Sequence, residues 1–280
     1  MLQPMTEILK NAKKGGYAIA QPDFLNITMA AMYLEAARRL KAPIILGYGE
    51  EYIANSEAKN LKHLVKIIES LVEEYNIPVT LHLDHGQSFE ICSKAIDAGF
   101  NSVMFDGSSL PFEENVAITK KVVEIAKPAG VSVEAELGYV GTADDINDDS
   151  KLTDPKMAKN FVKETNVDAL AVSIGTVHGQ YKGKPNIRLD LLSEINESVD
   201  IPLVLHGASG TGHEIIAECV KRGICKVNIY TDLVNVMEGS LRNDMKNFNS
   251  DLVSVTNNIR ESVIQELETY IKTLGSENMI

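Results

Sequence analysis

The sequence predicts a single α/β domain, a (β/α)8 or TIM barrel with additional helices at its C-terminus. Three observations support this fold class. Short apolar, β-branched runs recur eight times in the 280 residues, segments with the 3.6-residue period of a helix lie between them, and residues typical of helix ends mark the boundaries. Eight strand–helix units of about 30 residues are typical of this barrel, whose active site lies at the C-terminal ends of its strands.

The eight expected strands are short and rich in aliphatic residues. In chain order they are residues 17–20, 44–47, 79–83, 102–105, 131–137, 169–174, 203–205 and 225–229. The barrel therefore extends over about residues 16–232, and the whole chain, 1–280, is expected to form one domain because a single barrel of this length needs no division.

The helical period is clearest between the second and third expected strands. Spacings of three and four residues place its apolar residues on one face, at Leu61, Leu64, Val65, Ile68, Leu71, Val72 and Tyr75. Boundary residues agree with this reading. Asp154 followed by Pro155 is typical of a helix start, and Gly99 and Gly223 are expected to end helices before the next strands. A doubly wound open sheet is the alternative, but no glycine-rich dinucleotide turn follows the first strand.

Residues 233–280 are expected to form a helical extension. They contain few glycines before residue 275 and carry apolar residues at helical spacing, at Leu252, Val255, Ile259, Val263, Leu267 and Ile271. This stripe would pack on the barrel or on another subunit, and we expect a homodimer or homotetramer.

Composition excludes several kinds of partner. With 27 basic and 39 acidic residues the formal charge is −12, and no basic run is present, so we expect neither nucleic acid nor an anionic membrane as a partner. No apolar stretch approaches the roughly 20 residues of a membrane span, and the N-terminus does not resemble a secretion signal. Three unpatterned cysteines fit reduced thiols in the cytoplasm.

Three histidines follow three of the expected strands. His85, His178 and His206 come after the third, sixth and seventh apolar runs, and strand ends meet at one face of a barrel. Three imidazoles with an open fourth position are typical of a catalytic zinc site. Each histidine alone would be read as a capping or hydrogen-bonding residue, but their shared placement favours zinc. The other histidines are expected to support the site (His82) or to lie on helices.

Carboxylates gather at the same end of the barrel. Asp84 precedes a proposed ligand, so it is the best candidate for acid/base catalysis. Asp106 closes the fourth strand, and Glu134 and Glu136 share one face of the fifth. Asp106 and Glu136 fit a second or alternative metal position, and structural hydrogen-bonding roles fit them equally well.

Small polar residues follow the seventh and eighth strands, in residues 206–212 and 228–232. The loops after these strands form the usual phosphate site of such barrels, where backbone N–H groups meet the anion. Ser209 and Thr231 add hydroxyl groups to the glycines. A third loop, residues 175–182, adds the cation of Lys182 beside His178.

At these residues the chain resembles the class II, zinc-dependent ketose-bisphosphate aldolases, which include fructose- and tagatose-bisphosphate aldolases. The resemblance covers about residues 16–232. The segments that carry it are LHLDHG (81–86), VEAELG (133–138), GTVHGQYKG (175–183), LHGASG (205–210) and KVNIYTD (226–232).

The resemblance implies a role for each matching residue. Asp84 would be the catalytic acid/base and His85, His178 and His206 would hold zinc, while Asp106 and Glu136 match a second metal position, for another metal or a monovalent cation. The residues implied to bind dihydroxyacetone phosphate are Gly179, Lys182, Gly207, Ala208, Ser209, Asn228, Ile229, Tyr230 and Thr231. The implied reaction is the reversible aldol cleavage of a ketose 1,6-bisphosphate type of phosphorylated sugar, with a proton moved by Asp84.

Four positions depart from the family pattern: Asp23 stands for an asparagine, Gly49 for a serine, Asp144 for a loop glutamate, and Tyr230 for a small polar residue. An ionised Asp23 would repel charge developing on the substrate. It is therefore protonated, paired with a cation or directed at another substrate group, and we favour the last. From these changes we expect fructose 1,6-bisphosphate to be a poorer substrate than the preferred ketose.

Three other functions compete with this interpretation. A Schiff-base aldolase needs an inward lysine, usually on the sixth strand, which ends Val172-Ser173-Ile174 without one. A zinc hydrolase would use the same histidines with an activated water. A phosphosugar-binding barrel without catalytic activity is the alternative outside enzymes. The sequence does not choose between fructose-type and tagatose-type stereochemistry.

Overall fold

The computed structural model describes residues 2–53, 60–142, 148–181, 183, 185–246 and 251–280. Eight parallel strands form one sheet in the order β1-β8-β7-β6-β5-β4-β3-β2. The strands are β1 (Ile19–Pro22), β2 (Ile44–Gly49), β3 (Val79–Gly86), β4 (Ser102–Phe105), β5 (Ser132–Leu137), β6 (Ala169–Val172), β7 (Leu203–Leu205) and β8 (Ile224–Ile229). A parallel bridge between Asp23 and Gly47 joins β1 to β2, so the sheet forms a nearly closed barrel and confirms the predicted fold class.

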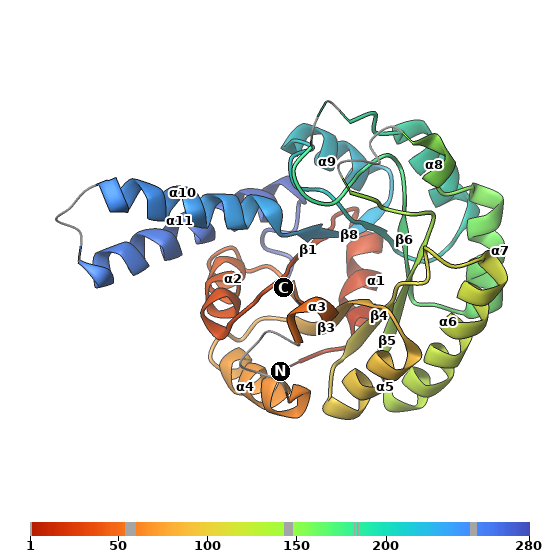
Figure 1. The fold of residues 1–280 in the computed structure, drawn as a ribbon, viewed down its shortest axis with the longest axis horizontal. Helices are drawn as coiled ribbons and strands as arrows, with labels where there is room; N and C mark the ends of the chain where they lie inside the picture. Colours follow the sequence, from red (N-terminus) through yellow and green to blue (C-terminus); the bar gives the residue numbers. More distant parts are fainter. Residues whose placement is uncertain (1, 54–59, 143–147, 182, 184, 247–250) are drawn as a thin grey trace.

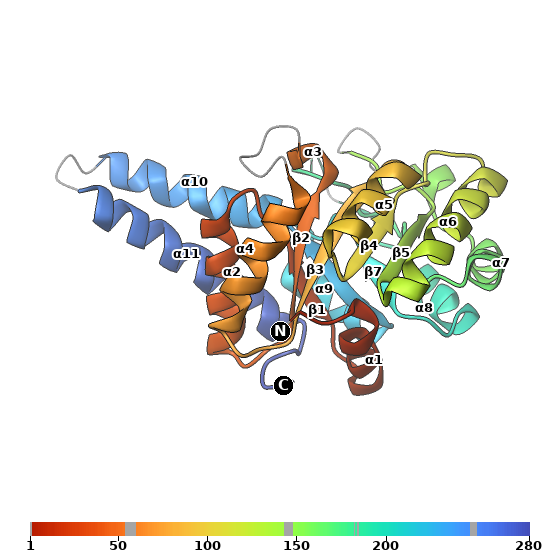
Figure 2. The same ribbon diagram turned by 90° about the horizontal axis from the view of Figure 1, so that it is seen from below.

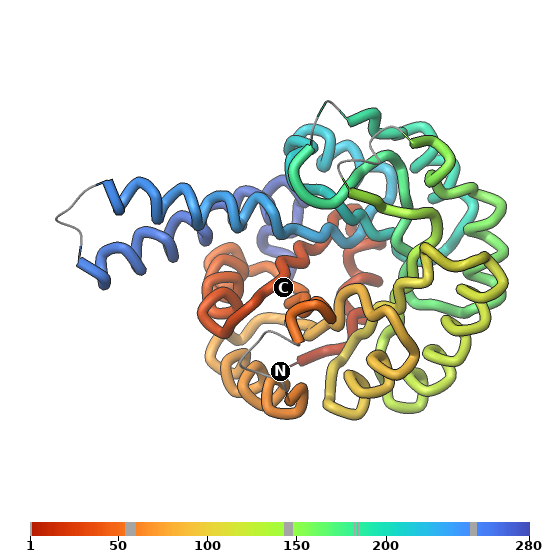
Figure 3. Tube along the Cα trace, in the orientation of Figure 1, coloured from red at the N-terminus to blue at the C-terminus, as the bar shows by residue number. Residues whose placement is uncertain are grey.

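Helices surround this sheet, as Figures 1 and 3 show. They are α1 (Met5–Gly15), α2 (Ile27–Arg39), α3 (Glu50–Ile53), α4 (Leu61–Glu73), α5 (Phe89–Ala98), α6 (Phe112–Ala126), α7 (Pro155–Thr165), α8 (Leu189–Ser198), α9 (His213–Lys221), α10 (Thr231–Lys246) and α11 (Leu252–Thr273). Two short 3-10 helices lie at Lys127–Ala129 and Asp149–Lys151. Within the described residues, no helix has the length and apolarity that a membrane crossing requires.

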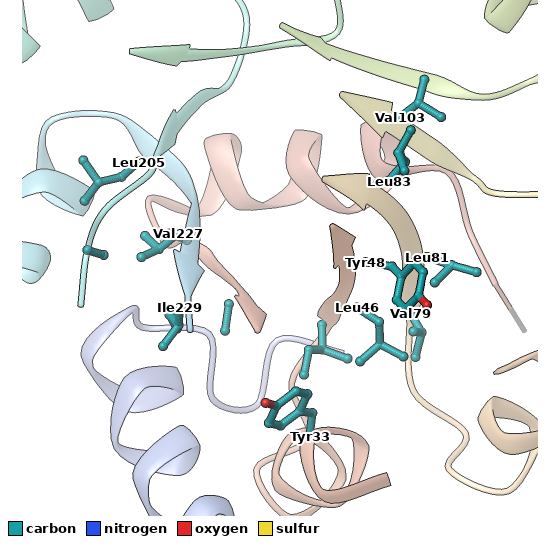
Figure 4. Packing of buried hydrophobic residues seen from close by; sticks show 14 of the residues in the cluster. Tyr33, Leu46, Tyr48, Val79, Leu81, Leu83, Val103, Leu205, Val227 and Ile229 are labelled. Atoms are coloured by element: carbon teal, nitrogen blue, oxygen red, sulfur yellow. The ribbon is translucent and has the colours of Figure 1, made fainter. Parts of the chain in front are cut away.

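Successive strand residues point to opposite faces of the sheet and build two cores. One core lies between the strands and the outer helices, and Figure 4 shows part of it, including Tyr33 of α2 and Leu46 of β2. The second joins α1 to alternating strand residues such as Ile19, Ile45 and Met104. In Figure 2, α1 lies at the end of the barrel opposite α3. Apolar packing therefore closes the N-terminal end and leaves the other end for polar groups.

The predicted helix boundaries are confirmed at three positions. The Asp154 carboxylate accepts hydrogen bonds from two backbone N–H groups in the first turn of α7. Gly99 ends α5 in the left-handed conformation with φ 106°, and Gly223, after α9, has φ 105°. The ends of the strands differ more from their predicted positions. β3 continues through Asp84 and His85 because its backbone pairs with β2 at Gly49 and with β4 at Phe105, whatever the polarity of the side chains.

The C-terminal extension is a pair of helices, α10 and α11, that projects from one side of the barrel (Figure 1). The later part of the predicted apolar stripe is buried, at Val263, Leu267 and Ile271, where α11 packs against α2. The earlier part is not, since Leu252 is 80% exposed. The arm therefore has one end fixed to the barrel and one end with exposed apolar side chains.

Candidate active site

A cavity of about 600 Å³ opens at the C-terminal ends of the strands. It brings together most of the residues predicted from the sequence: Asp23, Asp84, His85, Asp106, His178, Gly179, Gly207, Ala208, Ser209, Asn228, Ile229, Tyr230 and Thr231. His206 and Glu136 are buried behind this lining. Lys182 and Asp144 lie outside the described residues.

The three histidines converge, as the sequence predicted. His85, His178 and His206 each place a ring nitrogen within 4.8 Å of the other two, and Nε2 of His85 is 3.0 Å from Nδ1 of His206. Nε2 of His178 is buried and has no hydrogen-bond partner among the residues that the structure describes. His85 also has a φ of 48°, a left-handed conformation that is uncommon for residues other than glycine and is often found at functional sites.

The other nitrogen of each imidazole faces an acceptor. Nδ1 of His85 is 2.9 Å from Asp106, Nδ1 of His178 is 3.0 Å from the carbonyl oxygen of Val140, and Nε2 of His206 is 2.9 Å from Glu134. An acceptor at one nitrogen holds a proton there, so the other nitrogen is the one that can bind a metal once it is deprotonated. These three remaining nitrogens lie within 4.8 Å of one another, an arrangement that fits a metal ion with three imidazole ligands.

Burial and charge affect the three imidazoles differently. Burial lowers the pKa of His178 to about 4 and also lowers that of His206. Burial opposes protonation of His85 as well, but Asp84 and the hydrogen bond to Asp106 outweigh it and raise the pKa of His85 to about 10. Opposite charge within a few ångströms stabilises the protonated ring. The negative charge of this site is thus concentrated around His85.

A second group of ligand atoms joins His85, Asp106 and Glu136, again within 4.8 Å of one another. Burial, and then the charge of Asp106, raises the pKa of Glu136 to about 8. One oxygen of Glu136 accepts from the backbone N–H of Val140, and the other is buried with no hydrogen-bond partner in the described part of the chain. An unpartnered carboxylate oxygen beside a second carboxylate fits a cation position.

Asp84 lies within reach of both the imidazoles and the cavity. One of its oxygens is 3.8 Å from Nε2 of His85, and both oxygens receive the side-chain amide of Asn228, at 3.1 and 3.3 Å. Burial alone would raise the pKa of Asp84, but the neighbouring imidazoles of His85 and His82 hold it well below its usual range. Asp84 is therefore an ionised carboxylate that can accept a proton.

The loops after β7 and β8 form a small polar recess in the cavity wall. Gly207 has a φ of 67°, and a Cβ there would meet the backbone of Val177 at 2.6 Å, so this position requires glycine. Ser209 accepts a hydrogen bond from the backbone N–H of Asp232, in the first turn of α10. Helix N-termini and hydroxyl groups are typical anion ligands, so this recess suits a phosphate.

Asp23 lies on the wall beside Asp84. Its Oδ1 accepts from the side-chain amide of Gln21 at 3.1 Å, and a Cβ on Gly47 would clash with the same oxygen. Burial, and then the charge of Asp84, raises the pKa of Asp23 well above its usual range. The raised pKa favours a protonated Asp23, one of the three states expected from the sequence, and in this form the side chain can donate a hydrogen bond as an amide does.

Aromatic side chains form the adjoining wall. The rings of Tyr52 and Tyr230 lie 6.0 Å apart, and both residues line the cavity. A Cβ on Gly49 would already lie 3.0 Å from the ring of Tyr52. Gly49, read from the sequence as a missing hydroxyl, thus also makes room for Tyr52.

Two buried residues of the site were assigned no specific role from the sequence, although Glu134 was named among its carboxylates. Glu134 of β5 and Lys226 of β8 form an ion pair with an Nζ–Oε2 distance of 2.8 Å, beneath the imidazoles. The two-residue period of a strand could have indicated that both residues face the barrel interior, because Lys226 shares one strand face with Asn228, and Glu134 shares one with Glu136. Nothing in the sequence showed that the two strands place these charges opposite each other.

Comparison with known proteins gives one consistent result. The family model described as "Fructose-bisphosphate aldolase class-II" matches residues 3–279. The chain is 41% identical over 285 residues to a fructose-bisphosphate aldolase of Staphylococcus aureus, covering 99% of this chain and 98% of that protein. It is 46% identical over 235 residues to a probable fructose-bisphosphate aldolase of Bacillus subtilis, covering 82% of each.

Solved structures agree with the sequence comparisons. The crystal structure of the YdjI aldolase from Escherichia coli K12 is similar with a TM-score of 0.88 and 31% identity, covering 99% of this chain and 98% of that one. A protein from Coccidioides immitis, described as a putative fructose-1,6-biphosphate aldolase, is similar with a TM-score of 0.87 at 28% identity, and the match covers 98% of this chain and 97% of that one.

Proposed function

The chain belongs to the class II fructose-bisphosphate aldolase family and is an aldolase, and we propose that it cleaves a ketose 1,6-bisphosphate reversibly to dihydroxyacetone phosphate and an aldehyde. The observation that carries this proposal is the convergence of three imidazoles beside the ionised Asp84, in a cavity that also contains the recess formed by the loops after β7 and β8. Family membership makes the protein a metal-dependent lyase of carbohydrate metabolism.

We propose that zinc is the metal and that Nε2 of His85, Nε2 of His178 and Nδ1 of His206 hold it. When bound, zinc would polarise the substrate carbonyl and stabilise negative charge on substrate oxygens. The acceptors Asp106, Glu134 and the Val140 carbonyl support this assignment because they orient the rings. Asp106 and Glu136 are proposed as a second position, for another metal or a monovalent cation.

The proton transfer is assigned to Asp84. Its carboxylate accepts the proton of the C4 hydroxyl while the C3–C4 bond breaks, so that C4 becomes the aldehyde and the bonding electron pair stays with C3, which then takes up one proton to complete dihydroxyacetone phosphate. In the reverse direction Asp84 returns the proton to the new alkoxide. The low pKa of Asp84 supports this role because the residue is ionised at neutral pH.

The phosphate of the dihydroxyacetone fragment is assigned to the recess formed by residues 207–209 and 228–231, together with Gly179, which lines the same cavity. Backbone N–H groups at the start of α10 and the hydroxyls of Ser209 and Thr231 are the proposed donors. Lys182, whose position the structure does not describe, is proposed to assist from the loop after His178.

The proposed function is tested by mixing the zinc-loaded protein with fructose and tagatose 1,6-bisphosphates, ketose monophosphates and phosphorylated deoxy-keto acids, and coupling the reaction to dihydroxyacetone phosphate detection. We expect cleavage of at least one ketose bisphosphate. Inorganic phosphate without dihydroxyacetone phosphate would indicate a hydrolase instead, and binding without turnover of any compound would indicate a binding protein.

The same panel tests substrate preference. Tyr52 and Tyr230 occupy space at one wall of the cavity, and Gly49 offers no hydroxyl to a substrate. We therefore expect kcat/KM for fructose 1,6-bisphosphate to be at least about 10-fold below that of the preferred ketose. Asp23 contributes less to this expectation than the sequence suggested, since its neutral form can replace an amide donor. If fructose 1,6-bisphosphate is cleaved as well as every other compound, these residues do not set the preference.

We propose that the arm of α10 and α11 pairs with a second copy of the chain in a homodimer or homotetramer. Met245, Leu252 and Val253 are 70, 80 and 70% exposed, and apolar residues exposed together are typical of subunit contacts. The combined change Met245→Glu and Val253→Glu should shift the mass measured by light scattering to that of a monomer. Ile67→Glu, on the outer face of α4, is the control and should leave it unchanged.

We also propose that the protein is located in the cytoplasm. Cys92, Cys219 and Cys225 are buried free thiols in the structure, which is the usual state of cysteines in a reducing compartment. Fractionation of the native host cell would test this assignment.

A further inference from the structure

A buried ion pair beneath the cavity is not used by the proposed mechanism. Lys226 of β8 and Glu134 of β5 are both fully buried, with Nζ of the lysine 2.8 Å from Oε2 and 3.0 Å from Oε1 of the glutamate. Neither residue lines the cavity. Burying two charges costs free energy even when they are paired, and well-packed apolar residues often replace such pairs without loss. A specific role would explain why the charges are there.

Lys226 has a third partner, on its own strand. Its Nζ is 2.9 Å from Oδ1 of Asn228, so the ammonium group donates one hydrogen bond to Glu134, through Oε1, and one to Asn228. Because Oδ1 of Asn228 accepts this bond, its Nδ2 faces the other way, toward Asp84. A flipped amide would place its N–H groups against the ammonium group and its oxygen against a carboxylate. Lys226 therefore fixes the orientation of the Asn228 amide.

Glu134 extends the network in the other direction. Its Oε1 accepts from Nε2 of His206 at 2.9 Å, which leaves Nδ1 of His206 facing His85. Lys226 balances the charge of Glu134 and holds its carboxylate in place. One ammonium group thus contacts both Asn228, whose amide faces the base Asp84, and Glu134, which orients the proposed metal ligand His206.

We propose that Lys226 is a positioning residue for aldol cleavage, acting through Asn228 on Asp84 and through Glu134 on His206. This inference rests on the proposed function, because Asp84 and His206 are assigned there. Lys226 contacts neither substrate nor metal in this assignment. Its effect depends on two side chains whose orientation it fixes.

The first test separates positioning from folding. Lys226→Met alone would leave the Glu134 carboxylate buried and unpaired, which endangers the fold. The paired change Lys226→Met with Glu134→Gln removes both charges, and its new amide oxygen still accepts from Nε2 of His206. We expect this variant to fold and to bind zinc within about threefold of the unchanged protein, while kcat falls about 10- to 100-fold because the Asn228 amide is no longer oriented.

A double-mutant cycle decides whether the effect passes through Asn228. In an Asn228→Ala background the same paired change should lower kcat by less than about twofold, because the amide that Lys226 orients is absent. An equal loss in both backgrounds, or an unchanged kcat in the paired variant, would overturn the assignment to Asn228.

Zinc affinity, measured by competition with a chelator, tests the other branch without any activity assay. The pair Lys226→Met with Glu134→Leu has no acceptor for Nε2 of His206, so zinc should bind about 10- to 100-fold more weakly than to the pair with glutamine. Equal zinc affinity of the two pairs would overturn the branch through Glu134.

Lys221→Met is the matched control. Lys221 forms an exposed ion pair with Glu218 on α9, and its loss should change neither kcat nor zinc affinity. Absence of cleavage by the unchanged protein would refute the proposed function itself. Normal cleavage that is insensitive to all Lys226 variants would refute only the positioning role.

Discussion

Replacing Asp84 by alanine is expected to abolish ketose cleavage while leaving zinc bound. Asp84 is the ionised carboxylate that lies between the imidazoles and the cavity, and its nearest oxygen is 3.8 Å from Nε2 of His85. Loss of a positioned general base typically costs 10²- to 10⁴-fold in rate, so we expect kcat to fall by about 10³-fold. None of the three proposed ligand side chains is removed, and the zinc content should stay close to one ion per chain.

Two measurements on the same preparation check this prediction, steady-state cleavage and metal content. Asp97→Ala, an exposed aspartate of α5, controls for the loss of one negative charge and should leave both unchanged. If the Asp84 variant keeps more than a tenth of the activity, or if it loses zinc to the same extent as a ligand variant, Asp84 does not have the role assigned here.

The candidate ligands could be predicted from the sequence because the parallel topology of a barrel brings the C-terminal ends of its strands together. His85, His178 and His206 are far apart in the chain, but each is at or just after the C-terminal end of an apolar run, and in a barrel these ends meet. The local sequence pattern and the fold class together were therefore sufficient to predict that the three histidines converge. The same argument placed Ser209 and Thr231 in a common recess.

The supporting residues could not be predicted in this way. Glu134 and Lys226 are 92 positions apart, and whether they touch depends on the register of β5 and β8 across the interior. The protonation of Asp23 likewise depends on how close Asp84 lies, and the alternation of residues along a strand gives the face of a side chain but not this distance. The arm was predicted as helix, but the exposure of Leu252 depends on where α10 ends and α11 turns back.

The structure places one lysine, Lys226, inside the barrel, so the Schiff-base mechanism has to be considered as an alternative to the metal-dependent one. A Schiff-base aldolase would need this amine to reach the substrate carbonyl. Lys226 is fully buried, does not line the cavity, and has Glu134 and Asn228 as hydrogen-bond partners. We therefore expect borohydride to trap no substrate adduct on this or any other lysine.

Removing the metal should consequently eliminate activity. Chelator-treated protein is expected to retain less than about 1% of the cleavage rate, since metal-assisted polarisation of the carbonyl is worth several kcal/mol, and one equivalent of zinc should restore it. Zinc should also raise the unfolding temperature, because a ligand that binds only the folded state stabilises it. Full activity without metal, or a reduced lysine adduct, would refute the metal-dependent mechanism.

His178→Ala is the ligand variant that isolates this effect most cleanly. His85 is hydrogen-bonded to Asp106 and His206 to Glu134, so replacing either would also remove one hydrogen-bond partner from a carboxylate of the site. His178 donates only to the backbone carbonyl of Val140, and its Nε2 has no partner among the described residues. We expect zinc to bind at least about 10-fold more weakly and cleavage to recover partly at high zinc concentration, whereas His63→Ala, an exposed imidazole of α4, should change neither. Unaltered zinc affinity in the His178 variant would show that the three imidazoles do not form the metal site.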